Sequence, residues 1–191
     1  VVPERHGLER VLLASDADAY KALLLSGASV STSEEFLEEW LQPGVTRAVV
    51  NVHHFADQMT AHLAKRKDIE IIISDERSLL LETGGGVIKA LPLLGSDPFF
   101  AINTDVTWAT PRDTTFLQMA QAYNPNSMDA LLLLADMGET LGYRGAGDFF
   151  LTPDGQLQRR GDKPKAPYVF AGTHITRADQ HNLGGLPVQR G

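Results

Sequence analysis

Short apolar runs alternate along this chain with segments of helical period, and this alternation is the feature that most restricts its fold. Consecutive parallel strands need a crossover connection, which is usually a helix. The alternation therefore predicts an α/β protein, a Rossmann-like three-layer sandwich whose central sheet is mixed but mostly parallel. The strand-length runs lie at residues 10–14, 47–52, 69–74, 98–103 and 130–135, and the helical periods lie around residues 36–41, 59–63, 87–91 and 116–123.

After residue 136 the sequence changes character and becomes rich in glycine. Residues 148–152 and 156–158 flank the turn sequence Pro153-Asp154-Gly155, which predicts a small hairpin excursion. The last apolar run, residues 168–172, is expected to add one more strand to the main sheet. Without internal repeats, residues 1–191 are expected to form a single domain.

Composition excludes several classes of function. Seventeen Lys and Arg against 24 Asp and Glu give a net charge of −7, and the longest basic run is residues 65–67, so neither nucleic acid nor a membrane surface is an expected partner. Without cysteine, a disulfide framework, a thiolate zinc site and a cysteine nucleophile are all excluded. The apolar runs are too short to span a bilayer, and with no export signal at the start a cytoplasmic location is expected.

Three consecutive glycines, Gly84 to Gly86, mark the first candidate site. They follow an apolar strand and open a helix, where free N–H groups can meet polar or anionic atoms. A Walker phosphate loop is excluded, because Lys89 stands between Ile88 and Ala90 rather than in a Gly-Lys-Ser/Thr sequence. Two interpretations stay open: a ligand that approaches the glycine backbone closely, or a turn that needs glycine for its geometry alone.

Two further candidates also adjoin predicted strands. Asp105 directly follows the apolar strand ending at Asn103, and a carboxylate there can hold Mg²⁺ with substrate phosphates as further ligands, or can simply cap its loop. Asp162 and Lys163 offer an acid and a cation before the last strand, or are solvated turn residues. In open α/β sheets ligands bind at the carboxyl ends of the strands, so we expect Gly84–Gly86, Asp105 and Lys163 to share one cleft.

Taken together, these segments resemble the sugar-1-phosphate nucleotidyltransferase family. The resemblance is strongest to its N-acetylmuramate-1-phosphate uridylyltransferase and mannose-1-phosphate guanylyltransferase-like branch, and it covers about two thirds of the chain in the family's order. The matching segments are residues 44–47, 51–54, 73–76, 81–86, 89–94, 97–100, 103–105, 128–130, 142–143, 147–149 and 166–172.

The resemblance implies a reaction and its partners. A sugar-1-phosphate attacks the α-phosphorus of an NTP, UTP or GTP, to give an NDP-sugar and pyrophosphate, with Mg²⁺ as the cofactor. It also implies roles for residues: Lys21, Asp105 and Lys163 are catalytic, with Asp105 the magnesium ligand and Lys163 at the sugar phosphate. Nucleotide or sugar binding would fall to Glu82, Thr83, Gly84, Gly85, Asp148, Asp162 and Gly172.

The chain departs from the family pattern at both ends, which are expected to be altered or truncated. Family members carry a glycine-rich loop with an Arg after the first strand, whereas this chain has Asp16 and Asp18 there, and negative charge repels a triphosphate. The family's second magnesium aspartate has no counterpart before Gly191. An alternative function is therefore a catalytically weak or inactive nucleotide-sugar-binding domain or fragment, for which slow or absent turnover is expected.

Overall fold

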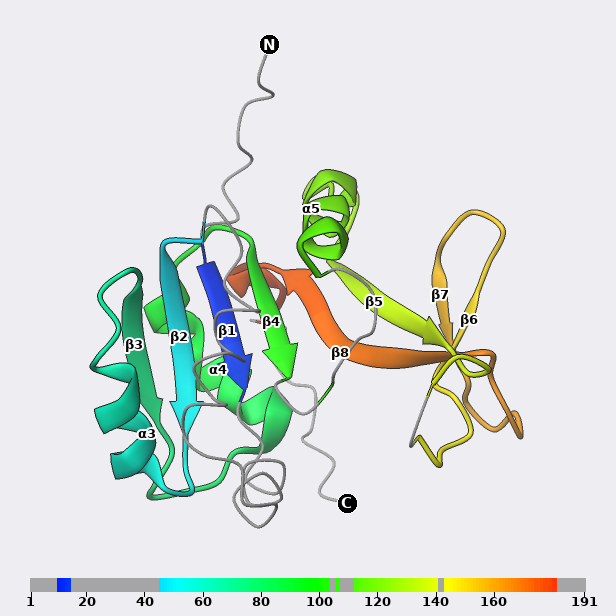
Figure 1. The fold of residues 1–191 in the computed structure, drawn as a ribbon. Coiled ribbons are helices and arrows are strands. Elements are labelled where there is room, and N and C mark those ends of the chain that lie inside the picture. The colour runs from blue at the N-terminus through cyan, green and yellow to red at the C-terminus, as the bar shows by residue number, and fades with distance from the viewer. Residues whose placement is uncertain (1–9, 15–44, 104–105, 107–111, 141–142, 182–191) are drawn as a thin grey trace.

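The computed structural model describes residues 10–14, 45–103, 106, 112–140 and 143–181. Its eight strands form one sheet in the order β3-β2-β1-β4-β8-β6-β7, with β5 paired to β8 (Figure 1). The strands are β1 (Arg10–Ala14), β2 (Arg47–Val52), β3 (Glu70–Asp75), β4 (Phe99–Asn103), β5 (Ala130–Asp136), β6 (Phe149–Leu151), β7 (Leu157–Arg159) and β8 (Tyr168–Thr176). The helices are α3 (Ala56–Leu63), α4 (Glu82–Leu94), α5 (Arg112–Ala122) and the 3₁₀ helix η1 (Ala178–His181).

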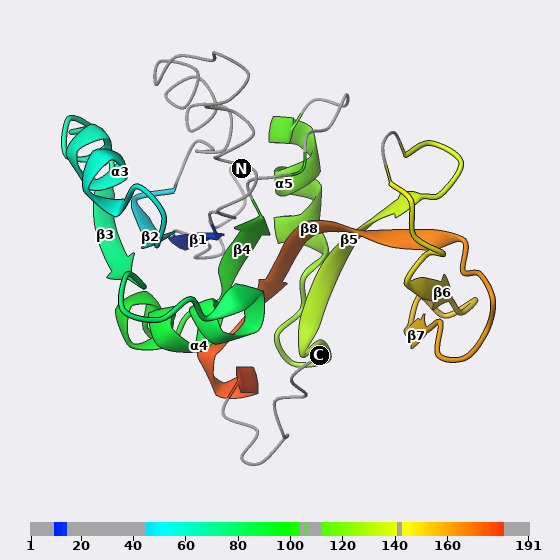
Figure 2. The ribbon, with the colours of Figure 1, turned by 90° about the horizontal axis from the view of Figure 1, so that it is seen from below.

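Helices cover both faces of the sheet, which gives the three layers seen in Figure 2. Because side chains alternate along a strand, β2 sends Ala48, Val50 and Val52 to one face and Val49 to the other. The first face packs against α3 and α5, and the second packs against α4. The α/β class and the layered arrangement agree with the pattern in the sequence.

The pairing directions divide the sheet into two halves. β3, β2, β1 and β4 are parallel neighbours, whereas β8 runs antiparallel to β4, β5 and β6, and β6 runs antiparallel to β7. The sheet is mixed as expected, but with four antiparallel pairings beside three parallel ones, the predominance of parallel pairing is not confirmed. An apolar run such as residues 130–135 carries no information on strand direction, so the pattern could not distinguish parallel from antiparallel pairing.

β8 bends where it passes from one half to the other. Gly172 has a φ of +73°, and the register between β5 and β8 shifts between Leu132 and Leu134, so β8 carries a bulge there. The residues after Gly172 pair with β4, and Tyr168 at the start of β8 pairs with the β6–β7 hairpin. Figure 1 shows the result: β5 and β8 extend from the main sheet as an arm that ends in the hairpin.

Most elements expected from the sequence are present within one or two residues of their expected bounds. The runs at residues 10–14 and 47–52 coincide with β1 and β2, and the hairpin around Pro153-Asp154-Gly155 is formed by β6 and β7. The last apolar run continues four residues further than expected, to Thr176. The helix expected around residues 36–41 lies outside the described residues. Within the described part of the chain, no helix has the length and apolar character needed to cross a membrane.

Candidate functional site

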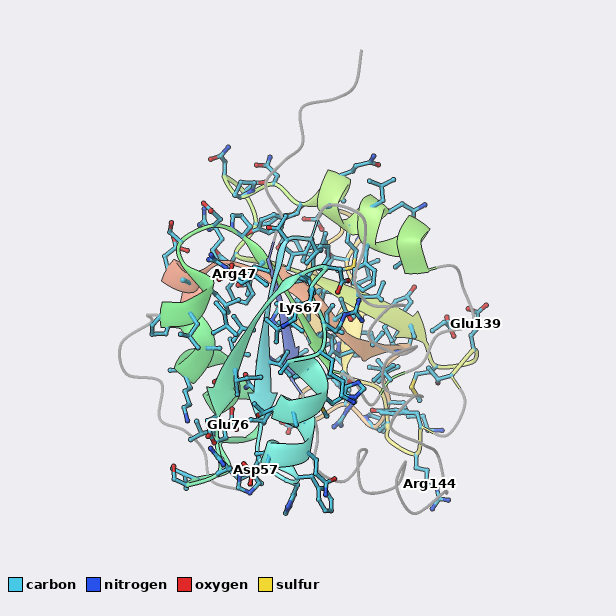
Figure 3. The ribbon with its side chains drawn as sticks, turned by 60° about the vertical axis from the view of Figure 1, so that its left-hand side comes forward. Arg47, Asp57, Lys67, Glu76, Glu139 and Arg144 are labelled. Atoms are coloured by element: carbon cyan, nitrogen blue, oxygen red, sulfur yellow. The ribbon has the colours of Figure 1, made fainter. Side chains whose placement is uncertain are left out.

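The parallel strands end at a common edge of the sheet, and the segment after β3 occupies that edge. It continues through Asp75, Glu76 and Arg77 and then enters α4 at Glu82. Figure 3 shows Glu76 and Asp57 near this edge, while Arg47, the first residue of β2, lies toward the opposite one. In open α/β sheets this is the edge at which ligands bind.

Glu76 is the centre of the polar contacts at this edge. Its side chain is buried, with the residue only 4% exposed, and a buried carboxylate needs hydrogen-bond donors. Asn51 Nδ2 donates to Glu76 Oε1 at 2.7 Å, and the Leu81 N–H donates to Glu76 Oε2 at 3.4 Å. The Glu76 N–H in turn donates to the Val52 carbonyl at 2.8 Å. One residue thus joins the end of β2, the end of β3 and the start of α4.

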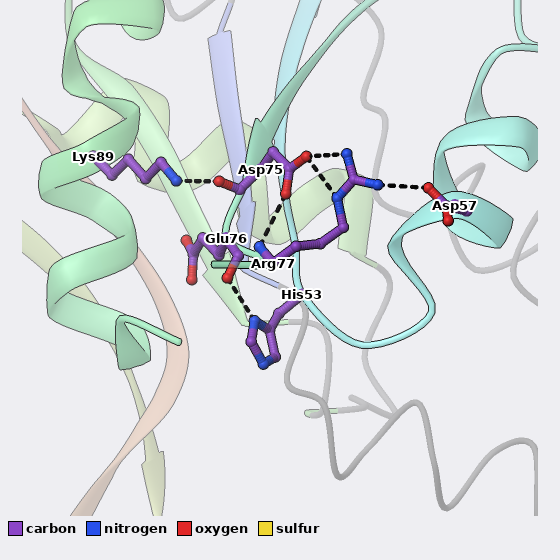
Figure 4. A network of polar contacts seen from close by, with 6 residues as sticks. All are labelled: His53, Asp57, Asp75, Glu76, Arg77 and Lys89. Atoms are coloured by element: carbon purple, nitrogen blue, oxygen red, sulfur yellow. Dashed lines mark hydrogen bonds and ion pairs between the residues drawn. The ribbon is translucent and has the colours of Figure 1, made fainter. Parts of the chain in front are cut away.

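A second, exposed set of contacts surrounds Glu76 (Figure 4). The Arg77 guanidinium pairs with the Asp75 carboxylate and, at 2.6 Å, with Asp57 at the start of α3. Lys89 of α4 donates to the Asp75 carbonyl. The hydrogen bonds from Arg77 lower the pKa of Asp75 to about 2. These contacts tie the strand end to the helices on both faces of the sheet.

His53 closes the same loop from the end of β2. Its Nδ1 lies 2.6 Å from the Glu76 carbonyl, and because a carbonyl can only accept, Nδ1 is the protonated nitrogen. The ring of His54 packs edge-on against that of His53, with the centroids 4.9 Å apart. His53 therefore helps to hold the loop that carries Glu76.

The three glycines lie inside α4, and none of them has a positive φ. The interpretation that a turn needs them for its backbone geometry is therefore wrong. Gly86 is buried, and a Cβ there would lie 2.4 Å from Asn51 Nδ2 and 2.9 Å from Glu76 Oε1. The close contact with Asn51 and Glu76 therefore explains why residue 86 is a glycine.

Gly84 has a different environment. It is exposed, and no heavy atom of the described residues lies within 4 Å of the position that its Cβ would take. The N-cap residue, Leu81, makes no side-chain capping hydrogen bond. The first N–H groups of α4 therefore donate no hydrogen bond to a capping side chain. The packing of the described residues gives no reason for glycine at position 84, whereas a ligand that touches the backbone would.

A second group of candidate residues lies on the arm. Asp148 Oδ2 accepts the Phe170 N–H at 2.9 Å, which fastens the hairpin to β8. Asp162 and Lys163 are exposed in the turn between β7 and β8, and Lys163 Nζ lies 4.2 Å from the centroid of the Phe150 ring. Figures 1 and 2 show this hairpin at the far end of the arm, away from α4. In the described residues no contact joins Lys163 to the glycines of α4.

Gly172 lies between the two groups. A Cβ on it would lie 3.0 Å from Val106 Cγ2 and 3.2 Å from Asn103 Cβ, so the bulge of β8 meets the end of β4 and the segment that follows it. Asp105 belongs to that segment but, like Lys21, lies outside the described residues. Glu82 and Thr83 open α4, and their side chains are also outside the described part.

The described residues hold no group of three His, Asp or Glu side chains able to bind a metal ion. A Mg²⁺ ion held by one or two carboxylates and by substrate phosphates needs no such group, and the assignment of Asp105 as a magnesium ligand stays a prediction.

Sequence reasoning missed the pair formed by Asn51 and Glu76. The signal was present: Asn51 is a polar residue in an apolar strand, and Glu76 follows another strand. Only the register of β2 on β3, which pairs Asn51 with Ser74, shows that the two lie side by side.

Known proteins resemble this chain in sequence and in fold, although no family model matches it. The N-acetylmuramate alpha-1-phosphate uridylyltransferase of Caulobacter vibrioides is 39% identical over 160 residues, which are 82% of this chain and 66% of that protein. The protein of the same name from Neisseria meningitidis serogroup B is 34% identical over 119 residues, or 61% of this chain and 49% of that protein. The chain thus spans about one half to two thirds of these curated relatives.

Among solved structures, the inositol-1-phosphate CTP transferase from T. maritima superposes with a TM-score of 0.69. The match covers 93% of this chain and 74% of that one at 12% sequence identity, so it supports the fold alone.

Proposed function

Because this chain belongs to the sugar-1-phosphate nucleotidyltransferase family, we propose that it transfers a uridylyl group from UTP to N-acetylmuramate α-1-phosphate. A phosphate oxygen of the sugar attacks the α-phosphorus of UTP, and the bond from that phosphorus to the pyrophosphate oxygen breaks. The products are UDP-N-acetylmuramate and pyrophosphate. Such transfers depend mainly on positioning and charge stabilisation, so no nucleophilic side chain is needed.

The observation that carries the proposal is the 39% identity over 160 residues with a uridylyltransferase. Both curated relatives have that same name, which favours UTP over GTP and favours a transferase over the binding-only alternative. The geometry at Gly84 is consistent with it, because an open glycine at the start of a helix lets a nucleotide approach the backbone.

The roles of individual residues follow from the resemblance and form part of the proposal. Glu82, Thr83, Gly84 and Gly85 contact the base and sugar, and Lys21 lies at the triphosphate. Asp105 would hold Mg²⁺, which would neutralise phosphate charge when bound. On the arm, Lys163 binds the sugar phosphate, and Asp148, Asp162 and Gly172 complete the sugar side.

A substrate panel tests this proposal. The full protein is incubated with Mg²⁺, each of the four NTPs and several sugar-1-phosphates, and pyrophosphate release is measured. UTP with N-acetylmuramate α-1-phosphate should give the fastest release, at roughly 1 to 10³ per second if the enzyme is typical. No release from any pair, together with calorimetric binding of UDP-N-acetylmuramate, would instead support a domain that binds nucleotide sugars without turnover.

A further inference from the structure

Arg160 lies at the centre of the turn that carries the candidate sugar-side residues. Its Nε donates to the Gly147 carbonyl at 2.9 Å, and its Nη1 donates to the carbonyls of Lys163 at 2.9 Å and Gly161 at 3.2 Å. The side chain is half-buried. A single guanidinium thus connects the segment before β6 with the turn after β7.

The backbone around Arg160 makes the same connection. The Arg160 N–H donates to the Asp148 carbonyl at 2.7 Å, and the Lys163 N–H donates to the Arg160 carbonyl at 3.2 Å. Asp148 is held in turn by its own N–H, which donates to the Tyr168 carbonyl at 2.7 Å. Asp148 and Lys163 are therefore parts of one hydrogen-bonded unit, with Arg160 between them, and Asp162 lies in the turn that these bonds close.

Among the described residues, one more backbone bond holds the end of this turn: the Ala166 N–H donates to the Ala146 carbonyl at 2.8 Å. Gly161 adopts a φ of +56° with open space around it among the described residues, and Asp162 and Lys163 are both exposed. The Lys163 ammonium contacts the Phe150 ring, and such an exposed cation–π contact is weak. Arginine suits the position because its planar fork donates in two directions, which a lysine ammonium on a flexible stem cannot match.

We infer that Arg160 is a positioning residue, which holds the turn of Gly161 to Lys163 against the segment of Gly147 and Asp148 and so presents Asp162 to the sugar and Lys163 to its phosphate. The inference rests on the proposed function for the identity of that substrate. It does not require Arg160 to touch the substrate, since its guanidinium is engaged by backbone carbonyls.

Arg160→Gln tests the inference, with Arg159→Gln as the matched control. The two arginines are neighbours and the substitutions remove the same charge, but Arg159 is exposed on the edge strand β7. In Arg160→Gln the KM for N-acetylmuramate α-1-phosphate should rise about tenfold or more, as expected when charge-assisted hydrogen bonds are lost, while the KM for UTP stays within about twofold. Arg160→Lys, which keeps the charge and one donor group, should fall between wild type and Arg160→Gln.

A general loss of structure would have a different signature, since it would lower kcat or raise both KM values together. That result, or equal KM values in the two Gln variants, would overturn the inference. Hydrogen exchange gives a second readout that needs no activity: the Lys163 and Ala166 amides should exchange faster in Arg160→Gln and not in Arg159→Gln. Unchanged exchange would overturn the inference. If the wild type releases no pyrophosphate, the proposed function fails and hydrogen exchange alone decides the positioning role.

Discussion

Glu76 places a buried carboxylate at the edge of the sheet where the candidate site lies. Its bonds with Asn51 and the Leu81 N–H compensate for its burial and also fix where α4 begins. Gly86 has to be glycine for the same reason, because the Asn51–Glu76 pair occupies the space that its Cβ would need. The small residue and the polar pair are therefore one structural unit.

Gly86→Ala should destabilise the protein. The added methyl group displaces Asn51 or Glu76, which are buried and bonded to each other, and overpacking of this kind typically costs about 1–3 kcal/mol. The free energy of unfolding from urea titration measures the loss. Gly84→Ala is the control: its methyl meets open space and alanine favours the helix, so stability should stay equal or rise by up to about 1 kcal/mol. Equal stabilities for the two variants would mean that Asn51 moves aside at no cost.

The ion pair of Asp75 and Arg77 predicts a pH-dependent contribution to stability. The pKa of Asp75 lies at about 2 in the folded protein against 3.8 ordinarily, mainly because Arg77 donates hydrogen bonds to it. A carboxyl whose pKa is lowered by folding stabilises the fold above its unfolded pKa, and the effect is lost as the pH falls through its folded pKa. The difference in urea midpoint between wild type and Asp75→Asn should therefore be full above about pH 4 and vanish below about pH 2.

Arg77→Gln supplies the control for this effect. In that background the carboxylate has lost its partner, so Asp75→Asn should change the midpoint much less than it does in the wild type. An equal change in both backgrounds would show that Arg77 does not stabilise the charged form of Asp75.

At the scale of elements, β8 determines how the two halves of the sheet are joined. Its later residues belong to the main sheet beside β4, its first residue pairs with the hairpin, and the bulge at Gly172 makes the bend between them. The bulge also brings Gly172 against Val106 and Asn103, next to the segment that contains Asp105. β8 thus connects the arm that carries the hairpin to the end of β4.

Gly172→Ala should cost more stability than Gly155→Ala. Both glycines have positive φ, +73° and +83°, so both variants carry the left-handed backbone penalty of about 1–2 kcal/mol. Only at position 172 does the new Cβ also press on Val106 and Asn103, at 3.0 and 3.2 Å, whereas the Cβ at position 155 meets nothing within 4 Å in the described residues. Thermal unfolding of the two variants measures the difference, and equal losses would mean that the close contact at β8 relaxes freely.

For the whole molecule, the sequence predicts local structure well and long-range arrangement poorly. Burial on both faces of the sheet determines a continuous apolar run such as Arg47–Val52, and a Pro-Asp-Gly turn determines the hairpin, so both are correct from sequence. The directions of β5 and β8 depend on which edge of the sheet is still unpaired when the chain comes back to it. No local pattern in the sequence encodes that edge.

The candidate site, too, has features that the sequence predicts and features that only the fold shows. The glycines of α4 stand out in the sequence because they are consecutive, whereas the partners of Arg160 lie up to 13 residues away and only the fold brings them together. Gly84 to Gly86 look equivalent in the sequence, but the structure separates a glycine needed for packing from one that faces open space.

Calorimetric titration of UTP into the wild-type protein and into Gly84→Ala shows whether the nucleotide binds at the start of α4, on the carboxyl edge of the parallel strands. The methyl group meets no described atom of the protein, so obstruction of the ligand is the effect expected of it. The wild type should bind UTP, and Gly84→Ala should bind it at least tenfold more weakly, a loss of about 1.4 kcal/mol, with undiminished stability. Equal UTP affinities in the two proteins, or no UTP binding by the wild type, would contradict this placement of the nucleotide.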